Sequence, residues 1–180
     1  MIKNTSRILN DCLLIDVNHF YDDRGTFTKF YSHNIFKELF SNIKIKEQFY
    51  TVSRKNVIRG MHFQSPPHQH DKLVTCISGK AIDVVLDLRT SSKTYGNFES
   101  FELNANKNSV IFIPAGFAHG FLSLEDNTCL LYGVSSIHSP KNDKGILWNS
   151  FGFNWPCKNP IISKRDKNQL ALNNYSSDFK

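Results

Sequence analysis

The chain has 180 residues, of which 40% are hydrophobic and 13% aromatic, and it carries a formal net charge of +6. That length suits one domain with a sizeable buried core, and a charged fraction of 21% is ordinary for a globular protein. Lysine and arginine are spread along the chain without a basic block or a periodic basic face, which argues against nucleic acid and favours a small anionic ligand such as a diphosphate.

The signals for location and redox state agree with each other. Met1 to Asn10 lacks the apolar core of a signal peptide, and no apolar run approaches the roughly 20 residues that span a bilayer. The four cysteines are widely spaced without a C-x-x-C pair, and Cys76 and Cys129 lie in apolar runs, as free buried thiols do. We therefore expect a soluble cytoplasmic protein with reduced cysteines and no membrane partner.

Strand signals dominate the chain. Short apolar runs bounded by Gly, Asn, Asp or Pro predict strands at Leu13–Val17, Phe27–Tyr31, Ile45–Ser53, Leu73–Ile77, Ile82–Arg89, Phe98–Leu103, Ser109–Ile113 and Cys129–Val134. In Ile82–Arg89 the residues alternate with a period of two, which predicts a half-buried strand. So many short strands indicate an all-β sandwich or barrel. We expect one domain over residues 1–180, with residues 161–180 as a tail packed on the barrel.

Two short helices are predicted beside the strands. The first begins near Ser32, with apolar residues on one side at Ile35, Phe36, Leu39 and Phe40. The second runs from Lys167 to Leu172 and precedes a chain end, residues 173–180, that is expected to fray.

The segment from Arg59 to Lys72 combines an arginine, several histidines and a lysine within strand-like sequence. Arg59 and His62 are three residues apart and would face opposite sides of a regular strand, so a shared site needs a bulge, which Gly60 can provide. Lys72 shares a strand face with apolar residues, and a lysine that points inward is costly without an anion. The segment is therefore the first candidate for an active site.

Three further residues belong to other parts of the chain. His119 and Tyr132 lie in short runs that a small barrel would point inward, although each alone is more often a structural residue with a satisfied hydrogen bond, as is His62. Asp166, taken by itself, is a solvated charge in a tail.

These residues fall within motifs whose order and spacing form a specific pattern. The motifs are Asp23–Phe27, Val57–Gln64, Lys72–Val74, Asp83–Arg89, Pro114–Phe121, Tyr132, Gly145–Asn149, Trp155–Pro156 and Ser163–Asp166. Through them the chain resembles the dTDP-4-dehydrorhamnose 3,5-epimerase family of cupin-type enzymes across about residues 10–166.

The resemblance implies a cupin-type jelly roll that acts as a homodimer, without metal or organic cofactor, on a nucleotide-diphospho-4-keto-6-deoxy sugar. It places the enzyme in the synthesis of surface polysaccharide sugars. It also implies roles for particular residues: His62 as the general base, Asp166 as the carboxylate that orients it, and Tyr132 as the acid on the opposite face.

The resemblance extends to residues that bind the substrate. Lys72 and Arg59 are expected near the sugar's carbonyl oxygen. Arg24 and Phe27 are expected to help hold the nucleotide, partly across the dimer interface. The further substrate-binding candidates are Lys29, Gln48, His119, His138 and Asp143.

Three positions depart from the family pattern. Lys29 replaces a glutamate, and Gln-x-Asn appears as Glu47-Gln48-Phe49 or shifted by one residue. His138 replaces a second tyrosine with an imidazole, a group that can titrate near neutrality. The nucleotide, which could be dTDP, GDP or CDP, therefore stays open, as does the choice between a hexose and a heptose. An epimerase that inverts only C3 or only C5 is the first alternative to double inversion.

Two rival functions use the same residues. In a metal-dependent cupin, His68, His70 and His119 would be the ligands, but the expected glutamate is absent and Pro66-Pro67 indicates a loop. In a non-catalytic sugar-binding barrel, the same aromatic and cationic residues would bind a sugar, and Tyr132 would not be needed.

Overall fold

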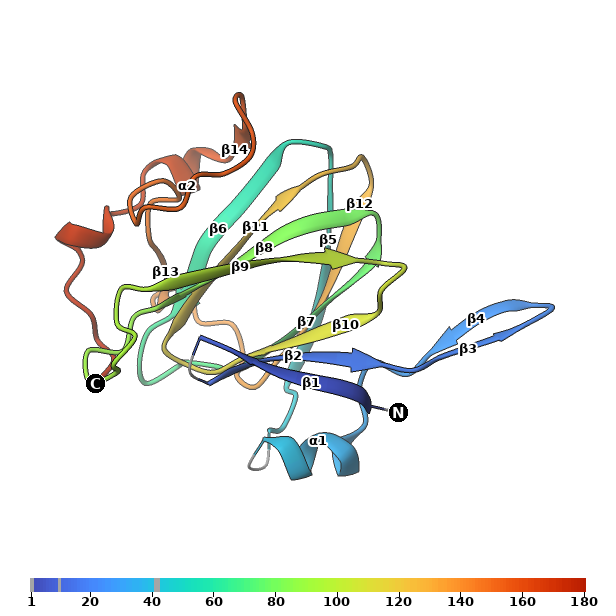
Figure 1. Cartoon of the computed structure of the whole chain (residues 1–180). Coiled ribbons are helices and arrows are strands. Elements are labelled where there is room, and N and C mark those ends of the chain that lie inside the picture. Colours follow the sequence, from blue (N-terminus) through green and yellow to red (C-terminus); the bar gives the residue numbers. More distant parts are fainter. Residues whose placement is uncertain (1, 10, 41–42) are drawn as a thin grey trace.

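The computed structural model describes residues 2–9, 11–40 and 43–180, and Figure 1 shows two β-sheets packed face to face. The first sheet, in the order β1-β2-β10-β7-β12-β5, contains β1 (Ile2–Ile8), β2 (Cys12–Val17), β5 (Glu47–Ser53), β7 (Lys72–Ser78), β10 (Ser109–Ile113) and β12 (Thr128–Val134). The second, in the order β13-β6-β11-β8-β9, contains β6 (Val57–Gln64), β8 (Lys80–Asp87), β9 (Phe98–Asn104), β11 (Phe117–Ser123) and β13 (Asp143–Gly145). The short strand β14 (Ile161–Ile162) runs parallel to β6. The prediction of an all-β sandwich is confirmed.

An apolar core fills the space between the sheets. Val74 and Leu130 enter it from the first sheet, while Val85 and Phe121 enter it from the second, because alternate residues of each strand face inward. Full burial of such a side chain stabilises the fold by about 1.5–3 kcal/mol. Polar residues on these same inward faces are therefore the unusual ones.

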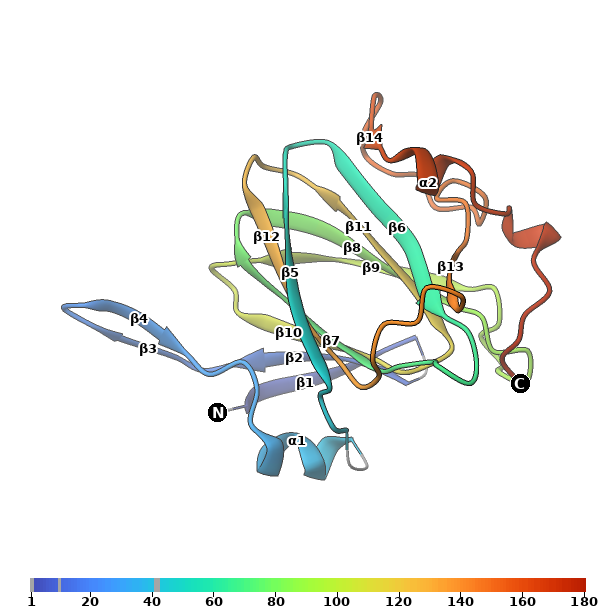
Figure 2. The same ribbon diagram turned by 180° about the vertical axis from the view of Figure 1, so that it is seen from behind.

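The outer faces of the sandwich are covered as well. Helix α1 (His33–Leu39) buries Phe36 against Ile15 and Val110 of the first sheet; the side chain of Ile35 lies outside the described part of the structure. The chain after β13 covers the second sheet, and Figure 2 shows this C-terminal segment beside β6, far from α1. Phe179 is buried in this cover, and its carbonyl accepts a hydrogen bond from Thr90, so the prediction that residues 173–180 fray is wrong.

The C-terminal helix differs from its predicted bounds. Helix α2 spans Lys164–Lys167, and a separate 3-10 helix, η1, spans Leu172–Asn174. Between them, Leu170 forms a β-bridge with Ile146, and its carbonyl accepts a hydrogen bond from the Leu147 amide. This pairing replaces the predicted helix at Leu170. In the described ranges, no helix is long and apolar enough to cross a membrane.

A two-stranded arm projects from the sandwich. Strands β3 (His19–Asp22) and β4 (Gly25–Thr28) pair with each other and with no other strand of the described chain, and Figures 1 and 2 show them extending away from the two sheets. The strand predicted at Phe27–Tyr31 therefore begins and ends earlier, because the tight turn between the two strands fixes the pairing of Asp22 with Gly25.

The alternation in Ile82–Arg89 has a different meaning from the predicted one. Strand β8 lies between β11 and β9, and its residues Val84 and Leu86 face the C-terminal cover while Asp83 and Val85 face the interior. Both faces are buried, so the prediction of a half-buried strand is wrong. The alternation instead places a fully buried aspartate, Asp83, inside the sandwich.

A bulge at Gly60 interrupts the regular pairing of β6 with β11. His62 pairs with His119 and Arg59 pairs with Phe121, so β6 has one more residue than β11 between the two pairs. Gly60 adopts a φ of +137°, and a Cβ atom there would lie 2.5 Å from the Cα of Gly120. Only glycine fits this close approach.

Candidate active site

One end of the space between the sheets opens into a cavity of about 260 Å³. Both sheets contribute to its wall, which also includes the loop before β13 and the first turn of α2. The wall is formed by Glu47, Phe49, Thr51, Arg59, His62, Phe63, Gln64, His70, Lys72, His119, Phe121, Tyr132, Val134, His138, Asp143 and Arg165. Seven of the twelve site residues predicted from sequence thus share one cavity: Arg59, His62, Lys72, His119, Tyr132, His138 and Asp143.

His62 is paired with a buried carboxylate from the C-terminal segment. Its Nε2 lies 2.7 Å from Oδ1 of Asp166, which is 3% exposed. Ser163 caps α2 by accepting a hydrogen bond from the Asp166 amide, and the Gly60 amide donates to Asp166 Oδ2 at 3.3 Å. With Nε2 held by the carboxylate, Nδ1 is the ring nitrogen left to accept a proton.

The ionisation of Asp166 is set by opposing effects. Burial favours its neutral form, but the hydrogen bond and charge of His62, the Gly60 amide and nearby Arg165 together lower the pKa of Asp166 below its ordinary value. An ionised carboxylate on one side of an imidazole fixes its tautomer and stabilises the imidazolium that forms when it takes a proton. The pair is therefore suited to act as a base.

Lys72 crosses the cavity floor from the first sheet to the second. Its side chain is buried, and Nζ donates a hydrogen bond of 2.9 Å to the carbonyl of His62. Burial lowers the pKa of Lys72 to about 8, although Asp143 and Asp83 act in the opposite direction. A cation in this low-dielectric position interacts strongly with a negative oxygen beside it.

Tyr132 faces the cavity from β12, in the first sheet. The residue is 6% exposed, and its ring stacks on Phe49 and meets His119 edge to face. Burial, and next the charge of Asp83, raise the pKa of the Tyr132 phenol above its ordinary value. The hydroxyl therefore keeps its proton at neutral pH and is available as a donor.

A second histidine–carboxylate pair lies deeper in the sandwich. The Nε2 atom of His119 lies 2.9 and 2.8 Å from the two carboxylate oxygens of Asp83, and both residues are almost fully buried. Burial raises the pKa of Asp83, while the hydrogen bond and charge of His119 oppose that shift. Asp83 was not among the residues predicted for the site, although Val85 on the same strand face was a sign that this face is not exposed.

Arg59 lies at the exposed mouth of the cavity. Its Nε donates to the Ser53 hydroxyl at 3.0 Å, and a terminal nitrogen donates to the Val52 carbonyl at 3.2 Å. The bulge at Gly60 allows Arg59 and His62 to reach the same cavity.

The opposite rim is built around Asp143. Its Oδ1 accepts a hydrogen bond from Arg165 at 2.6 Å, and its Oδ2 lies 3.3 Å from Nε2 of His138. The His138 amide donates to Glu47 at 3.1 Å, which ties this loop to β5. Burial favours the neutral acid, but Arg165, His138 and the charge of His62 lower the pKa of Asp143. Arg165 was not predicted for the site, and only its position beside Asp166 could have indicated it.

The cavity, its polar residues and the sandwich match a known family. A model of the family described as dTDP-4-dehydrorhamnose 3,5-epimerase matches residues 6–174. The dTDP-4-dehydrorhamnose 3,5-epimerase of Shigella flexneri is 35% identical over 161 residues, which cover 88% of this chain and 89% of that protein. The chain belongs to the dTDP-4-dehydrorhamnose 3,5-epimerase family.

Two further similarities place the chain within this family. A crystal structure of the dTDP-4-dehydrorhamnose 3,5-epimerase of Bacillus anthracis str. Ames, with TDP and PPi bound, has a TM-score of 0.92 and 32% sequence identity, covering 96% of this chain and 100% of that one. A protein of Streptomyces niveus named dTDP-4-dehydrorhamnose 3-epimerase is 33% identical and covers 84% of this chain and 74% of that protein. The predicted family, its cupin-type jelly roll and the class of enzyme, an isomerase of nucleotide sugars, are confirmed.

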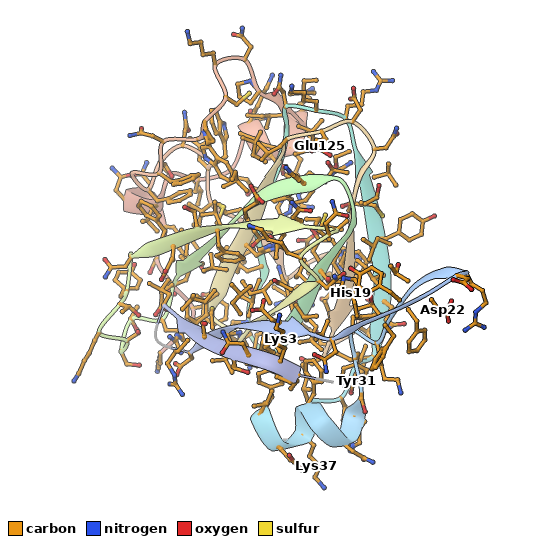
Figure 3. All side chains as sticks on the ribbon, turned by 45° about the vertical axis from the view of Figure 1, so that its right-hand side comes forward. Lys3, His19, Asp22, Tyr31, Lys37 and Glu125 are labelled. Carbon is orange, nitrogen blue, oxygen red and sulfur yellow. The ribbon has the colours of Figure 1, made fainter. Side chains whose placement is uncertain are left out.

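Apart from Asp166, which lies behind His62, four residues expected in the site of this epimerase family member lie outside the cavity. Arg24 and Phe27 are exposed on the β3–β4 arm, where Arg24 pairs with Asp22, and Lys29 is exposed just after it. Figure 3 shows Asp22 toward the tip of the arm, with His19 nearer the sandwich. Successive side chains of a strand point to opposite faces, and Glu47 and Phe49 line the cavity, so Gln48 points away from it.

The histidines of the rival metal reading have separate environments. His68 is exposed, His70 lies beside Gln64 and Ser136, and His119 is held by Asp83. Burial, and next the charge of Lys72, lower the pKa of His70 to about 3, so this ring is neutral. In the described part of the chain, no three His, Cys, Asp or Glu residues are grouped to hold a metal ion.

Proposed function

We propose that the protein inverts C3 and C5 of a dTDP-linked 4-keto-6-deoxy hexose. The observation that carries this proposal is the arrangement of base, acid and cation: His62 enters the cavity from the second sheet, Tyr132 enters from the first, and Lys72 crosses between the sheets. Inversion requires a base and an acid on opposite faces of the ring. A base and an acid carried by opposing sheets meet that requirement.

Each inversion is a removal and a return of one proton. His62 takes the proton from the carbon next to the C4 ketone, and the electron pair of the broken C–H bond moves onto the ketone oxygen as an enolate. Lys72 stabilises the negative oxygen, with Arg59 nearby at the mouth. The enolate then collapses, and carbon takes a proton from Tyr132 on the other face. Asp166 keeps His62 oriented throughout.

The nucleotide and the oligomer belong to the same proposal. The bound TDP of the Bacillus anthracis relative supports dTDP over GDP or CDP. The arm exposes Phe20, Tyr21 and Phe27 to solvent beside Arg24, which supports a homodimer in which the arm reaches the nucleotide in the other copy's cavity. His119 and His138 complete the sugar-binding wall, and a role in the synthesis of surface polysaccharide sugars follows from the substrate.

Deuterium exchange tests the proposed reaction directly. With dTDP-4-keto-6-deoxyglucose in deuterated water, NMR should show exchange at C3 and C5, and His62→Ala should abolish it. His68→Ala is the matched control, because His68 is exposed in the same segment and outside the cavity. A wild-type enzyme that exchanges neither position with dTDP, GDP or CDP sugars, including heptoses, would exclude the proposal and favour a sugar-binding barrel.

Inversion at a single carbon is the second candidate. The Streptomyces niveus relative is named a 3-epimerase, so the family includes single-centre chemistry. Exchange at C3 without exchange at C5 would select this alternative.

A further inference from the structure

The carboxylate of Asp143 is occupied by groups of the protein itself. Arg165 is bound to one oxygen and His138 lies beside the other, and the side chain is 23% exposed. Each of the two oxygens therefore already has a partner within the protein. These contacts point to a structural role for Asp143 beside the substrate contact expected from sequence.

Asp143 stands next to the segment that carries Asp166. Helix α2 is a single turn, Lys164–Lys167, and a helix of that length is not stable without contacts to the rest of the fold. Its own end is capped by Ser163, and Asp166 contacts His62 and Gly60. Arg165, the residue directly before Asp166, adds an anchor on the cavity side. The position of Asp166 thus depends on what holds Arg165.

Strand β13 fixes the position of Asp143 for its contact with Arg165. It pairs with β6 so that Asp143 lies opposite Gln64 and Gly145 lies opposite His62. The ion pair with Arg165 therefore connects α2 to a strand whose neighbour carries the base. The contacts His62–Asp166 and Asp143–Arg165 form two parallel links between α2 and the second sheet.

We propose that Asp143 is a positioning residue that acts through Arg165 to hold Asp166 at hydrogen-bonding distance from His62. The inference rests on the proposed epimerase function for its kinetic consequences. Since a misplacement of about 1 Å in a catalytic group can lower the rate about 100-fold, Asp143→Ala should lower kcat by about 10- to 100-fold. KM should change less than kcat, because Lys72, Arg59 and His119 remain in the cavity wall.

A double-mutant cycle on the full chain tests the proposal. Asp143→Ala, Arg165→Ala and the double variant are compared in the exchange assay. Because both residues act through one pair, the double variant should lose no more activity than the more impaired single variant. Asp178→Ala is the matched control: it breaks the 2.7 Å ion pair of Lys144, the next residue on β13, and should keep the wild-type kcat. Asp143→Asn, which keeps an acceptor for Arg165, should lose less than Asp143→Ala and serves if the alanine variant does not fold.

A second readout does not depend on activity. In the substrate-free protein labelled with nitrogen-15, the ring signals of His62 should shift in Asp143→Ala and stay in place in Asp178→Ala. Unchanged His62 signals, additive kinetic losses, or a raised KM with normal kcat would each overturn the positioning role. If the wild type shows no exchange, the proposed function is contradicted. The ring signals of His62 would still show whether Asp143 positions the pair of His62 and Asp166.

Discussion

The phenol ring of Tyr132 stacks on the ring of Phe49, with centroids 4.8 Å apart and planes 12° from parallel. The two residues lie directly opposite each other on β12 and β5. Stacking of this kind restricts the side chain to one orientation. The aromatic contact with Phe49 therefore helps to hold the proposed acid in place.

Removal of the Tyr132 hydroxyl should separate exchange from inversion. Tyr132→Phe keeps the stack and the base but loses the proton donor, so net inversion should fall by about 100-fold or more while deuterium exchange falls much less. NMR of the substrate in deuterated water measures both rates in one sample. Equal losses of exchange and inversion would contradict the assignment of His62 as base and Tyr132 as acid.

Neutralising the carboxylate of Asp166, which contacts His62, should strongly lower the rate of exchange. Asp166→Asn keeps the size of the side chain but removes the charge that stabilises the imidazolium, so kcat for exchange should fall by about 1000-fold, within the range that general bases contribute. Asp178→Asn, an exposed carboxylate elsewhere on the C-terminal segment, provides the control and should exchange at the wild-type rate. A variant that keeps most of its activity would mean that Asp166 is not part of the base.

The charge on Lys72 should produce the basic limb of the pH profile. With a pKa of about 8, its ammonium loses its proton as the pH rises through that value, and the stabilisation of the enolate is lost with it. Exchange rates of the wild type should therefore decline above about pH 8. In Lys72→Arg, whose guanidinium stays charged, any remaining activity should not decline over the same range. A basic limb that is identical in both proteins would assign it to another group.

The buried His119–Asp83 pair should contribute to stability. His119→Leu leaves Asp83 buried without its partner, which should lower the free energy of unfolding by about 3–5 kcal/mol at neutral pH. The pKa of Asp83 is already raised above 3.8, and loss of His119 raises it further, so the folded variant binds more protons than the unfolded chain. Its deficit should therefore shrink as the pH falls toward 4.

Denaturant titrations at several pH values measure this effect. The double variant Asp83→Leu with His119→Leu should recover much of the loss, because no unpaired charge remains buried. A single variant as stable as the wild type at neutral pH would show that Asp83 does not need His119.

Sequence reasoning placed much of this site, for reasons that the structure makes clear. Inward-facing positions of strands follow a period of two, so Lys72 and Tyr132 could be assigned to the barrel interior without knowing which sheets they join. Gly60 was expected to allow a bulge, and the bulge brings Arg59 and His62 to one cavity. Asp166 could be placed only through the family resemblance, because its contact with His62 spans 104 positions of sequence.

The residues that sequence reasoning misplaced share another cause. Asp83 was assigned to a half-exposed strand because alternation does not reveal that a distant segment covers the opposite face. Gln48 was chosen over Glu47 and Phe49 because the register of β5 depends on its pairing with β12, which no local pattern specifies. Arg165 was missed because the ion pair with Asp143 forms only when α2 docks beside β13.

The separation between His62 and Asp166 also sets the order in which the two are synthesised. The strands of both main sheets, apart from the two-residue β14, are complete by Gly145, and Asp166, the partner of His62, follows later in the chain. Until the residues after β13 have been synthesised, the second sheet lacks its apolar cover and His62 lacks the carboxylate of Asp166. The proposed pair of base and carboxylate is therefore completed last in the order of synthesis, after the strands of both main sheets.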